Sequence, residues 1–375
     1  MKIFVKQFVS NCLKLKIMNW SNEITDLLKI KYPIIQAPMF GVTTTEMVVS
    51  ASNSGCLGSL PLADISSDKA IELIDSVKSQ TDQQFAVNIF VYDLPEIDQK
   101  LKDNYKRVKT FIENLASDHQ LEVNLPEIEN LSYSGYRDLI DIVISKGCKI
   151  LSFTFGLPDK VSVQKLKENN VVLIGTCTTL EEAILLEKSG IDIICFQGSE
   201  AGGHRGNFLS EIPTDNLGIS LLSEVASAVS VPIIYAGGIY SGQDMIRLKN
   251  RGVQGYQVGS LLIGSTESAL TTSEKNRLKA LGENDIVLTK SFSGRYASGV
   301  RNSFTQSLDE IADILPFPFQ NKLTAELKKV AKAHNNIEFV NIWTGKTAKN
   351  FSELPTQQIL KILINEAETF IINNK

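Results

Sequence analysis

Between residues 32 and 260, eight short apolar runs rich in Val and Ile alternate with longer amphipathic stretches. Buried parallel strands have the first composition, and the helices that connect them have the second. We predict strands at residues 33–37, 57–60, 85–90, 149–153, 171–176, 191–197, 232–236 and 254–260, and helices most clearly at residues 67–78, 179–188, 219–228 and 242–251. Eight strand and helix units predict an α/β fold, for which a (β/α)8 TIM barrel is the economical architecture.

The same pattern divides the chain into parts. Residues 20–265 form the predicted barrel. After residue 265 the alternation stops, and we expect residues 266–345 to form a smaller, mostly helical cap over the barrel mouth and residues 346–375 to form a helix that packs on the outside of the barrel. Residues 91–148 add charged helical sequence, which we interpret as packing and cover.

Residues 1–19 are an N-terminal extension with four lysines and no acidic residue. We interpret residues 1–17 as sequence upstream of a true start at Met18, and a frayed amphipathic tail is the alternative. The segment has no arginine, no small-residue cleavage site and no long apolar run, so it does not have the pattern of a targeting peptide.

Composition excludes several classes of function. The 38 Lys and Arg against 42 Asp and Glu give a formal charge of −4, without the basic excess that nucleic-acid binding needs. No apolar run approaches the ~18 to 20 residues of a membrane span. The five cysteines are odd in number, far apart and without a CxxC pair, which argues against a disulfide framework and a structural zinc site. We expect a cytoplasmic protein with no nucleic-acid or membrane partner.

The richest segment for chemistry is residues 197–206, Gln-Gly-Ser-Glu-Ala-Gly-Gly-His-Arg-Gly, directly after the sixth predicted strand. In a barrel, the loops after strands form the face where ligands bind. Its glycines permit close approach to a ligand, and His204 adds a group that ordinarily titrates near pH ~6.5. The plain alternative is a flexible glycine loop with an exposed histidine. The other histidines, His119 and His334, lie in charged helical surroundings and are expected to be solvated.

Further glycine turns end the seventh and eighth predicted strands, at residues 236–242 and 257–261. Barrels often bind a phosphate with these two loops, because small residues let backbone N–H groups converge. Residues 38–41 and Asn88 end the first and third strands at the same mouth, where an aromatic cofactor slot is expected.

Other catalytic motifs are absent from the sequence. Residues 343–347, Trp-Thr-Gly-Lys-Thr, imitate the end of a P-loop, but Val340 stands where that motif needs its first glycine. No GxGxxG follows the first strand, no GxSxG is present, and the three histidines lack metal-ligand spacing. Zinc and serine hydrolases are therefore excluded, and no metal site is predicted.

The segments at residues 35–39, 87–90, 198–206, 236–239, 257–260 and 291–302 together resemble nitronate monooxygenases, formerly called 2-nitropropane dioxygenases. The resemblance covers about residues 20–345, and residues 291–302 point to the class I branch. It implies a barrel that binds FMN and uses O2 to oxidise small alkyl nitronates, such as propionate 3-nitronate, to a carbonyl compound and nitrite.

The resemblance also implies roles for individual residues. His204 is the implied catalytic residue, either as a cation that binds nitronate oxygens or as a neutral base that removes the α-proton of a nitroalkane. Arg295 or Tyr296 is a candidate for holding a substrate carboxylate, with a solvated loop arginine as the alternative. Ser260 stands where the family often has Thr and keeps the hydroxyl. The expected cofactor-binding residues are Ala37, Pro38, Met39, Asn88, Gln197, Gly202, Gly203, Gly237, Gly238, Gln257, Val258, Gly259 and Ser260.

Two other functions remain open at this point. Flavin-dependent enoyl-acyl carrier protein reductases resemble the same barrel and share the Glu-Ala-Gly-Gly-His loop, but they would consume NAD(P)H. A non-redox isomerase or aldolase would use the two phosphate turns to bind a sugar phosphate and would be colourless. It would also need a catalytic lysine or paired carboxylates at strand ends, and none is obvious. The oligomeric state is not indicated.

Overall fold

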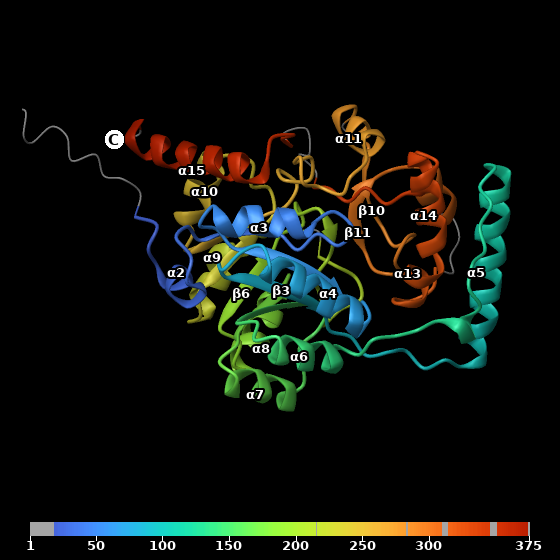
Figure 1. Ribbon diagram of the computed structural model, residues 1–375, viewed down its shortest axis with the longest axis horizontal. Helices are drawn as coiled ribbons and strands as arrows, with labels where there is room; N and C mark the ends of the chain where they lie inside the picture. The colour runs from blue at the N-terminus through green and yellow to red at the C-terminus, as the bar shows by residue number, and fades with distance from the viewer. Residues whose placement is uncertain (1–18, 215, 283, 310–313, 346–350, 374–375) are drawn as a thin grey trace, which may run out of the picture.

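Eight parallel strands form the centre of the molecule in a computed structural model that describes residues 19–214, 216–282, 284–309, 314–345 and 351–373 (Figure 1). They are β1 (Ile34–Gln36), β2 (Gly58–Ala63), β3 (Phe85–Phe90), β4 (Ile150–Thr154), β5 (Val172–Cys177), β6 (Ile193–Gln197), β8 (Ile233–Ala236) and β9 (Gly255–Val258). Their order is β1-β9-β8-β6-β5-β4-β3-β2, and the parallel bridge between Ile35 and Leu57 joins the two ends. The predicted TIM barrel is confirmed. The prediction for residues 1–17 lies outside the described residues.

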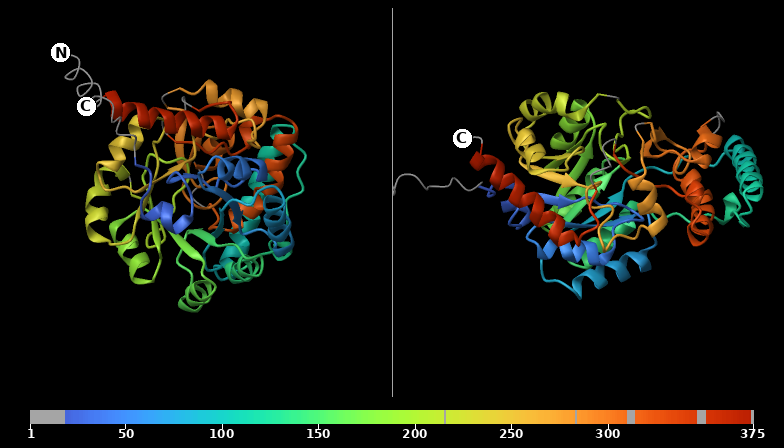
Figure 2. Two further views of the ribbon diagram at one scale, coloured as in Figure 1. Left: turned by 60° about the vertical axis from the view of Figure 1, so that its left-hand side comes forward. Right: turned by 90° about the horizontal axis from the view of Figure 1, so that it is seen from above.

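Helices surround the barrel (Figure 2, left). They are α3 (Thr45–Asn53), α4 (Ser67–Lys78), α6 (Tyr136–Ser145), α7 (Lys160–Glu168), α8 (Leu180–Lys188), α9 (Gly218–Ala228) and α10 (Gly242–Lys249), and α15 (Thr356–Asn373) lies against α10 and α3. Polar N-cap side chains fix several starts: Ser66 accepts from Lys69 N, and Thr179 accepts from Glu182 N. The four predicted helices are confirmed to within two residues at each end.

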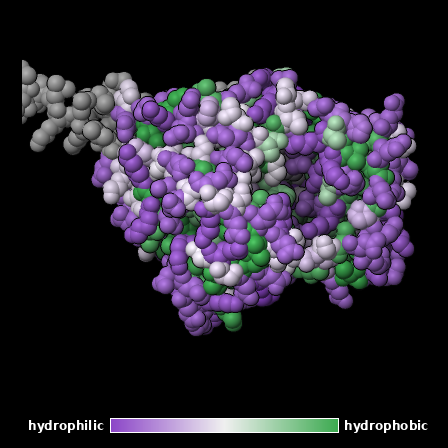
Figure 3. Space-filling model, viewed as in Figure 1, coloured by the Kyte–Doolittle hydropathy of each residue, from purple (hydrophilic) through white to green (hydrophobic). Residues whose placement is uncertain are grey.

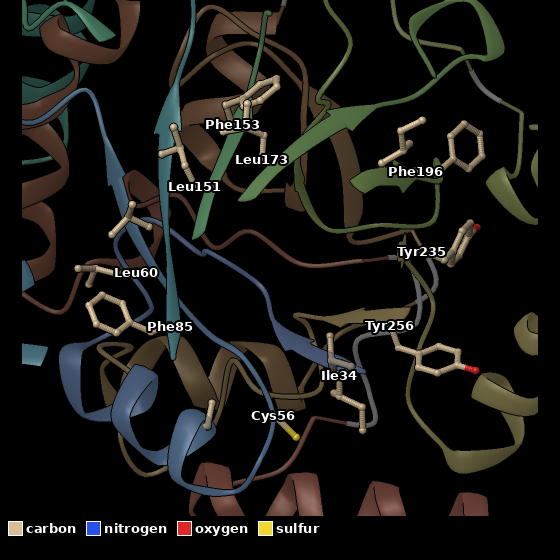
Figure 4. Close-up of a cluster of buried hydrophobic side chains, with 14 of the residues drawn as sticks. Ile34, Cys56, Leu60, Phe85, Leu151, Phe153, Leu173, Phe196, Tyr235 and Tyr256 are labelled. Carbon is tan, nitrogen blue, oxygen red and sulfur yellow. The ribbon is translucent and has the colours of Figure 1, made fainter. Parts of the chain in front are cut away.

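Alternate side chains of the strands enter two different cores. Outward-facing residues such as Leu60, Leu151 and Leu173 pack among the helices (Figure 4). Inward-facing Ile35, Ile174 and Ile234 fill the barrel, and Ile24 and Leu28 of α2 (Glu23–Leu28) belong to the same buried cluster. The interior is thus packed with side chains, and space for a ligand remains at the carboxyl ends of the strands.

A second hydrophobic core lies in the cap. It is built by α11 (Thr272–Lys279), β10 (Ile286–Thr289), β11 (Ala297–Val300), α12 (Ser303–Asp309), α13 (Phe319–Leu323), α14 (Ala325–Ala333), η2 (Ile337–Phe339), and by the distant α5 (Gln99–Asp118) and η1 (Ile128–Asn130). Tyr105, Val108 and Ile112 of α5 recur at helical spacing and are buried in this core. The views agree that α5 and α14 lie at one end of the molecule (Figures 1 and 2). Residues 99–130 therefore pack with the cap, and we propose that the cap unit includes them.

The described residues contain no helix long and apolar enough to cross a membrane. They contain four free cysteines, Cys56, Cys148, Cys177 and Cys195, all buried. Burial raises the pKa of Cys195 to about 12 and that of Cys148 to about 11, so these thiols are held in the protonated, unreactive form.

Candidate active site

A cavity of about 390 Å³ lies at the carboxyl ends of the barrel strands and extends beneath the cap. In the view of Figure 3, the molecular surface is hollowed between the barrel and the cap. The cavity is lined by all but one of the expected catalytic and cofactor-binding residues: Ala37, Pro38, Met39, Asn88, Gln197, Gly202, Gly203, His204, Gly237, Gly238, Gln257, Gly259 and Ser260. Val258 is the exception. Its side chain is buried between barrel and helices, because successive residues of a strand face opposite sides.

The glycine turns after β8 and β9 fit an anion. Gly238 has a φ of +63°, a left-handed conformation that glycine adopts without strain. Among the described residues, no acceptor pairs with the backbone N–H groups of Gly238, Ile239, Gly259 or Ser260, all of which line the cavity. Unpaired N–H groups at the ends of strands β8 and β9 are the donors that a phosphate requires. No arginine or lysine is needed at this point.

The Glu200 side chain packs against these glycine positions. It accepts hydrogen bonds from Gly218 N at 3.0 Å and from the Tyr235 hydroxyl. A Cβ at Gly237 would lie 3.0 Å from Glu200 Cγ, and a Cβ at Gly238 would lie 3.3 Å from it. Side chains at these two positions would therefore press on a fixed carboxylate and close the space for a ligand phosphate.

The remaining walls suit a flat ring system. Asn88 donates Nδ2 to Ser152 Oγ at 2.9 Å, which orients its amide. Among the described residues, the Gln257 side chain has no hydrogen-bond partner, although it lines the cavity. Gln197 instead uses both amide atoms on the protein: Nε2 donates to His204 O at 2.9 Å, and Oε1 accepts from Gly206 N at 2.8 Å. The free Gln257 amide and the anion cradle suit a ligand that carries both a polar ring and a phosphate, and Gln197 fixes the histidine loop.

The histidine loop is held by the cap. Gly203 and His204 form β7, which pairs antiparallel with β11 in the three-stranded sheet β10-β11-β7. Arg205 is 4% exposed and donates to the carbonyls of Ala201 (2.8 Å) and Ser199 (2.6 Å) and to Ser298 Oγ (2.8 Å). The loop expected from its glycines thus contains a short strand, because the cap supplies a hydrogen-bonding partner.

Small size is required at Gly202. A Cβ there would lie 2.5 Å from both Gly345 N and the carbonyl carbon of Thr344. Gly345 N also donates to Ser260 Oγ at 3.0 Å. Thr344 and Gly345, from the described part of the segment that imitates a P-loop, therefore pack against the histidine loop and the β9 turn.

The His204 imidazole is held in one orientation. Its Nε2 lies 2.8 Å from Ser293 Oγ, and Ser293 Oγ donates to the carbonyl of Arg295 at 3.1 Å. The donor in the contact between His204 and Ser293 depends on the imidazole tautomer. A carbonyl oxygen can only accept, so when the serine proton is used on the Arg295 carbonyl, His204 Nε2 is the donor. Nδ1 then keeps the lone pair of the neutral ring. Phe155 and Trp343 contact the imidazole, with ring centroids 5.5 and 5.3 Å away.

His204 is neutral at physiological pH. Burial, aided by the positive charges of Arg295 and Lys328, lowers its pKa to about 3, well below the ordinary value that the sequence suggests. Of the two roles left open by the sequence, this environment favours a neutral base over a cationic anchor. His119 and His334 are exposed, so the prediction that they are solvated is confirmed.

Arg295 and Tyr296 do not line the cavity. The Arg295 guanidinium stacks on the ring of Phe155, 4.3 Å from its centroid, and donates to the carbonyl of Asn207. Tyr296 lies beneath Lys290, whose Nζ is 5.2 Å from the ring centroid. The cap arginine thus supports the wall behind His204.

Sequence reasoning missed several residues of the cavity. Phe317 and Trp343 supply apolar wall from the cap, and Lys328 of α14 supplies a cation. No local signal marks Lys328, which is one of several lysines on a helix. Trp343 lies in the segment set aside as a false P-loop.

A closed barrel with a ligand-sized cavity at the carboxyl ends of its strands defines an enzyme of the TIM-barrel class.

Comparison with known proteins gives the family. The family model described as nitronate monooxygenase matches residues 21–366. A probable nitronate monooxygenase of Staphylococcus saprophyticus is 34% identical over 354 residues, covering 93% of this chain and 98% of the relative. One from Staphylococcus aureus is 34% identical over 349 residues, covering 92% and 97%. The chain belongs to the nitronate monooxygenase family and is a flavin-dependent oxidoreductase.

Solved structures agree with this fold. Nitroalkane oxidase from Streptomyces ansochromogenes superposes with a TM-score of 0.83 at 26% identity, covering 94% of this chain and 100% of that chain. FabK from Thermotoga maritima superposes with a TM-score of 0.73 at 22% identity, covering 95% and 99%, and shares the fold.

Proposed function

We propose that the protein is an FMN-dependent nitronate monooxygenase, which oxidises small alkyl nitronates such as propionate 3-nitronate with O2 to a carbonyl compound and nitrite. The observation that carries the proposal is the neutral His204, fixed by Ser293 in a cavity that also contains the anion cradle of backbone N–H groups. Membership of the family supplies the reaction type.

The proposed cofactor is FMN rather than a dinucleotide. The turns of Gly237–Gly238 and Gly259–Ser260 would hold one phosphate, and Asn88 and Gln257 would contact the ring system. When bound, the flavin supplies the electron transfer between the nitronate and oxygen. The sequence has no dinucleotide fingerprint, which supports the mononucleotide.

The protein's own contribution is proton handling and positioning. His204 Nδ1 would remove the α-proton of a neutral nitroalkane, while the hydrogen bond from Nε2 to Ser293 keeps the ring in place. The aromatic wall of Phe155, Phe317 and Trp343 limits water around the reacting carbon. A preformed nitronate needs no such deprotonation, and the site then has only to bind it.

The visible spectrum and substrate consumption of the purified protein test the function. We expect a yellow protein that, after heat release, yields one chromophore per chain with the mass of FMN. With ethylnitronate or propionate 3-nitronate, it should consume O2 and form nitrite. Finding FAD would contradict the cofactor assignment. Rapid oxidation of NADH without nitronate turnover would instead identify the enoyl reductase, and a colourless protein that takes up no flavin would favour the isomerase or aldolase.

A further inference from the structure

Lys328 is a cavity-lining cation of the cap that forms no salt bridge with a carboxylate among the described residues. It lies on α14 and lines the cavity. Its Nζ donates to Asn321 Oδ1 at 3.2 Å. Two neighbouring lysines at the cavity edge are paired: Lys332 lies 3.2 Å from Glu274, and Lys329 lies 3.3 Å from Glu326. Within the part of the chain that the structure describes, no carboxylate forms a salt bridge with Lys328.

Asp64, the acidic group whose charge acts on Lys328, is already engaged. Its Oδ2 lies 3.3 Å from Lys322 Nζ and accepts a hydrogen bond from the Tyr92 hydroxyl at 3.1 Å. Burial lowers the pKa of Lys328 to about 8, and the charge of Asp64 opposes this only in part. An enclosed ammonium without a counter-ion is costly, so such a group is retained where a ligand supplies the missing charge.

Lys328 and His204 belong to one site. The Lys328 charge is near enough to lower the pKa of His204, although the two residues come from α14 and β7. A neutral imidazole and a cation therefore face the same cavity from different elements. The imidazole can handle a proton, whereas the ammonium can bind negative charge without accepting one.

We propose that Lys328 is the counter-ion for an oxyanion of the substrate, either the nitronate oxygens or a carboxylate on the same molecule. The inference rests on the proposed function and assigns within it the recognition of negative charge, which sequence reasoning had sought at Arg295 or Tyr296. Lys328 binds the substrate electrostatically, and no covalent step is involved.

Three variants test the role of Lys328. Lys328→Met removes the charge and keeps an unbranched side chain, and Lys328→Arg keeps the charge. Lys279→Met is the matched control, since Lys279 lies on α11 of the cap, does not line the cavity, and has a side chain that is 49% exposed and paired with Glu353. Circular dichroism and flavin content establish that each variant folds and binds its cofactor.

Three substrates distinguish the source of the charge. Ethylnitronate carries only the nitronate anion, propionate 3-nitronate adds a carboxylate, and nitroethane is neutral. We expect Lys328→Met to raise KM for the anion it binds by about 10- to 100-fold, with a smaller change in kcat. A rise with both anions assigns Lys328 to the nitronate oxygens, and a rise with propionate 3-nitronate alone assigns it to the carboxylate. Lys328→Arg and Lys279→Met should stay within about threefold of wild type.

Calorimetric titration with propionate gives a readout independent of turnover. Wild type and Lys328→Arg should bind this inert carboxylate about 10-fold or more tightly than Lys328→Met. Unchanged KM for both anions and unchanged propionate affinity in Lys328→Met would overturn the inference, as would an equal loss with nitroethane. If wild type oxidises no nitronate, the proposed function fails, yet the propionate comparison still decides whether Lys328 is an anion site.

Discussion

Replacing His204 by asparagine separates the chemistry of the imidazole from its place in the fold. The residue is held through its backbone, by pairing with Ala297 and by the Gln197 hydrogen bond to its carbonyl, so folding and flavin content should persist. The side chain loses its basic Nδ1 and its contact with Ser293. Neutral nitroethane reports the loss of the base, and preformed ethylnitronate reports the loss of any contact between the imidazole and the anion.

The expected losses on the two substrate forms differ by about an order of magnitude or more. Neutral nitroethane needs a base, and loss of a general base typically costs ~10²- to 10⁴-fold in rate, or about 3 to 5 kcal/mol. Preformed ethylnitronate needs no base, and loss of one neutral hydrogen bond of ~0.5 to 1.5 kcal/mol lowers kcat/KM by about 2- to 12-fold. His334→Asn, at an exposed position of the cap, is the control and should change neither rate.

The pH dependence of kcat/KM tests independently whether His204 is unprotonated in the free enzyme. Because the pKa of His204 is about 3, the base is already unprotonated at pH 5, and kcat/KM of wild type with nitroethane should be level between pH 5 and 8. A base with an ordinary pKa of ~6.5 would lose about thirtyfold at pH 5. Oxygen consumption with both substrates over this range measures both effects.

Three results would refute the reasoning. Near-normal turnover of both substrate forms by His204→Asn would remove the imidazole from the mechanism. Equal and severe losses on both forms would show that it acts on the anion rather than on the proton. An acid limb near pH 6.5 in wild type, absent from the variant, would show that burial does not depress its pKa.

Other perturbations test the cradle, the loop and the cap cation. Gly238→Asp places a carboxylate among the unpaired N–H groups, and we expect flavin content to fall severalfold with an unchanged circular dichroism spectrum; full retention would place the phosphate elsewhere. Arg205→Met leaves buried carbonyls and Ser298 without their donor, which should cost about 3 to 5 kcal/mol in urea unfolding, whereas a loss below about 1 kcal/mol would show that the loop holds without it. Since the pKa of Lys328 is about 8, its charge is complete below that value and lost above it, so kcat/KM for an anionic nitronate should fall as pH rises beyond about 8 in wild type and stay level in Lys328→Met.

The barrel was predictable because its strands are buried on both sides. Such strands are continuous apolar runs, and all eight were found at the expected places. Their ends were less certain. The strand predicted at residues 57–60 continues as β2 to Ala63 through an irregularity in its pairing with β3, where Ala63 adopts a φ of +52°.

β7 is a strand that the sequence pattern does not predict. Two residues, Gly203 and His204, have no strand periodicity of their own, and their partner β11 begins at Ala297, far along the chain. The cap is similar, because α5 joins its core from a stretch more than 150 residues before α11. Pairings over such separations leave no local signal, since they depend on how the barrel brings its loops together.

By itself, the sequence determined the barrel, the glycine turns and the place of His204. Buried strands, glycine turns and the order of strands and loops are all encoded by short segments of the chain, so they can be recognised without the tertiary structure. Only the tertiary structure decided the electrostatics of the site. The pKa of His204 depends on burial and on Arg295 and Lys328, which come from later segments of the chain. Lys328 differs from the neighbouring Lys329 and Lys332 because burial lowers its pKa and no carboxylate among the described residues forms a salt bridge with it. Charge acts through space and scales with desolvation, so a catalytic histidine can be located by motif, whereas its protonation and its cationic neighbour follow from the folded cap.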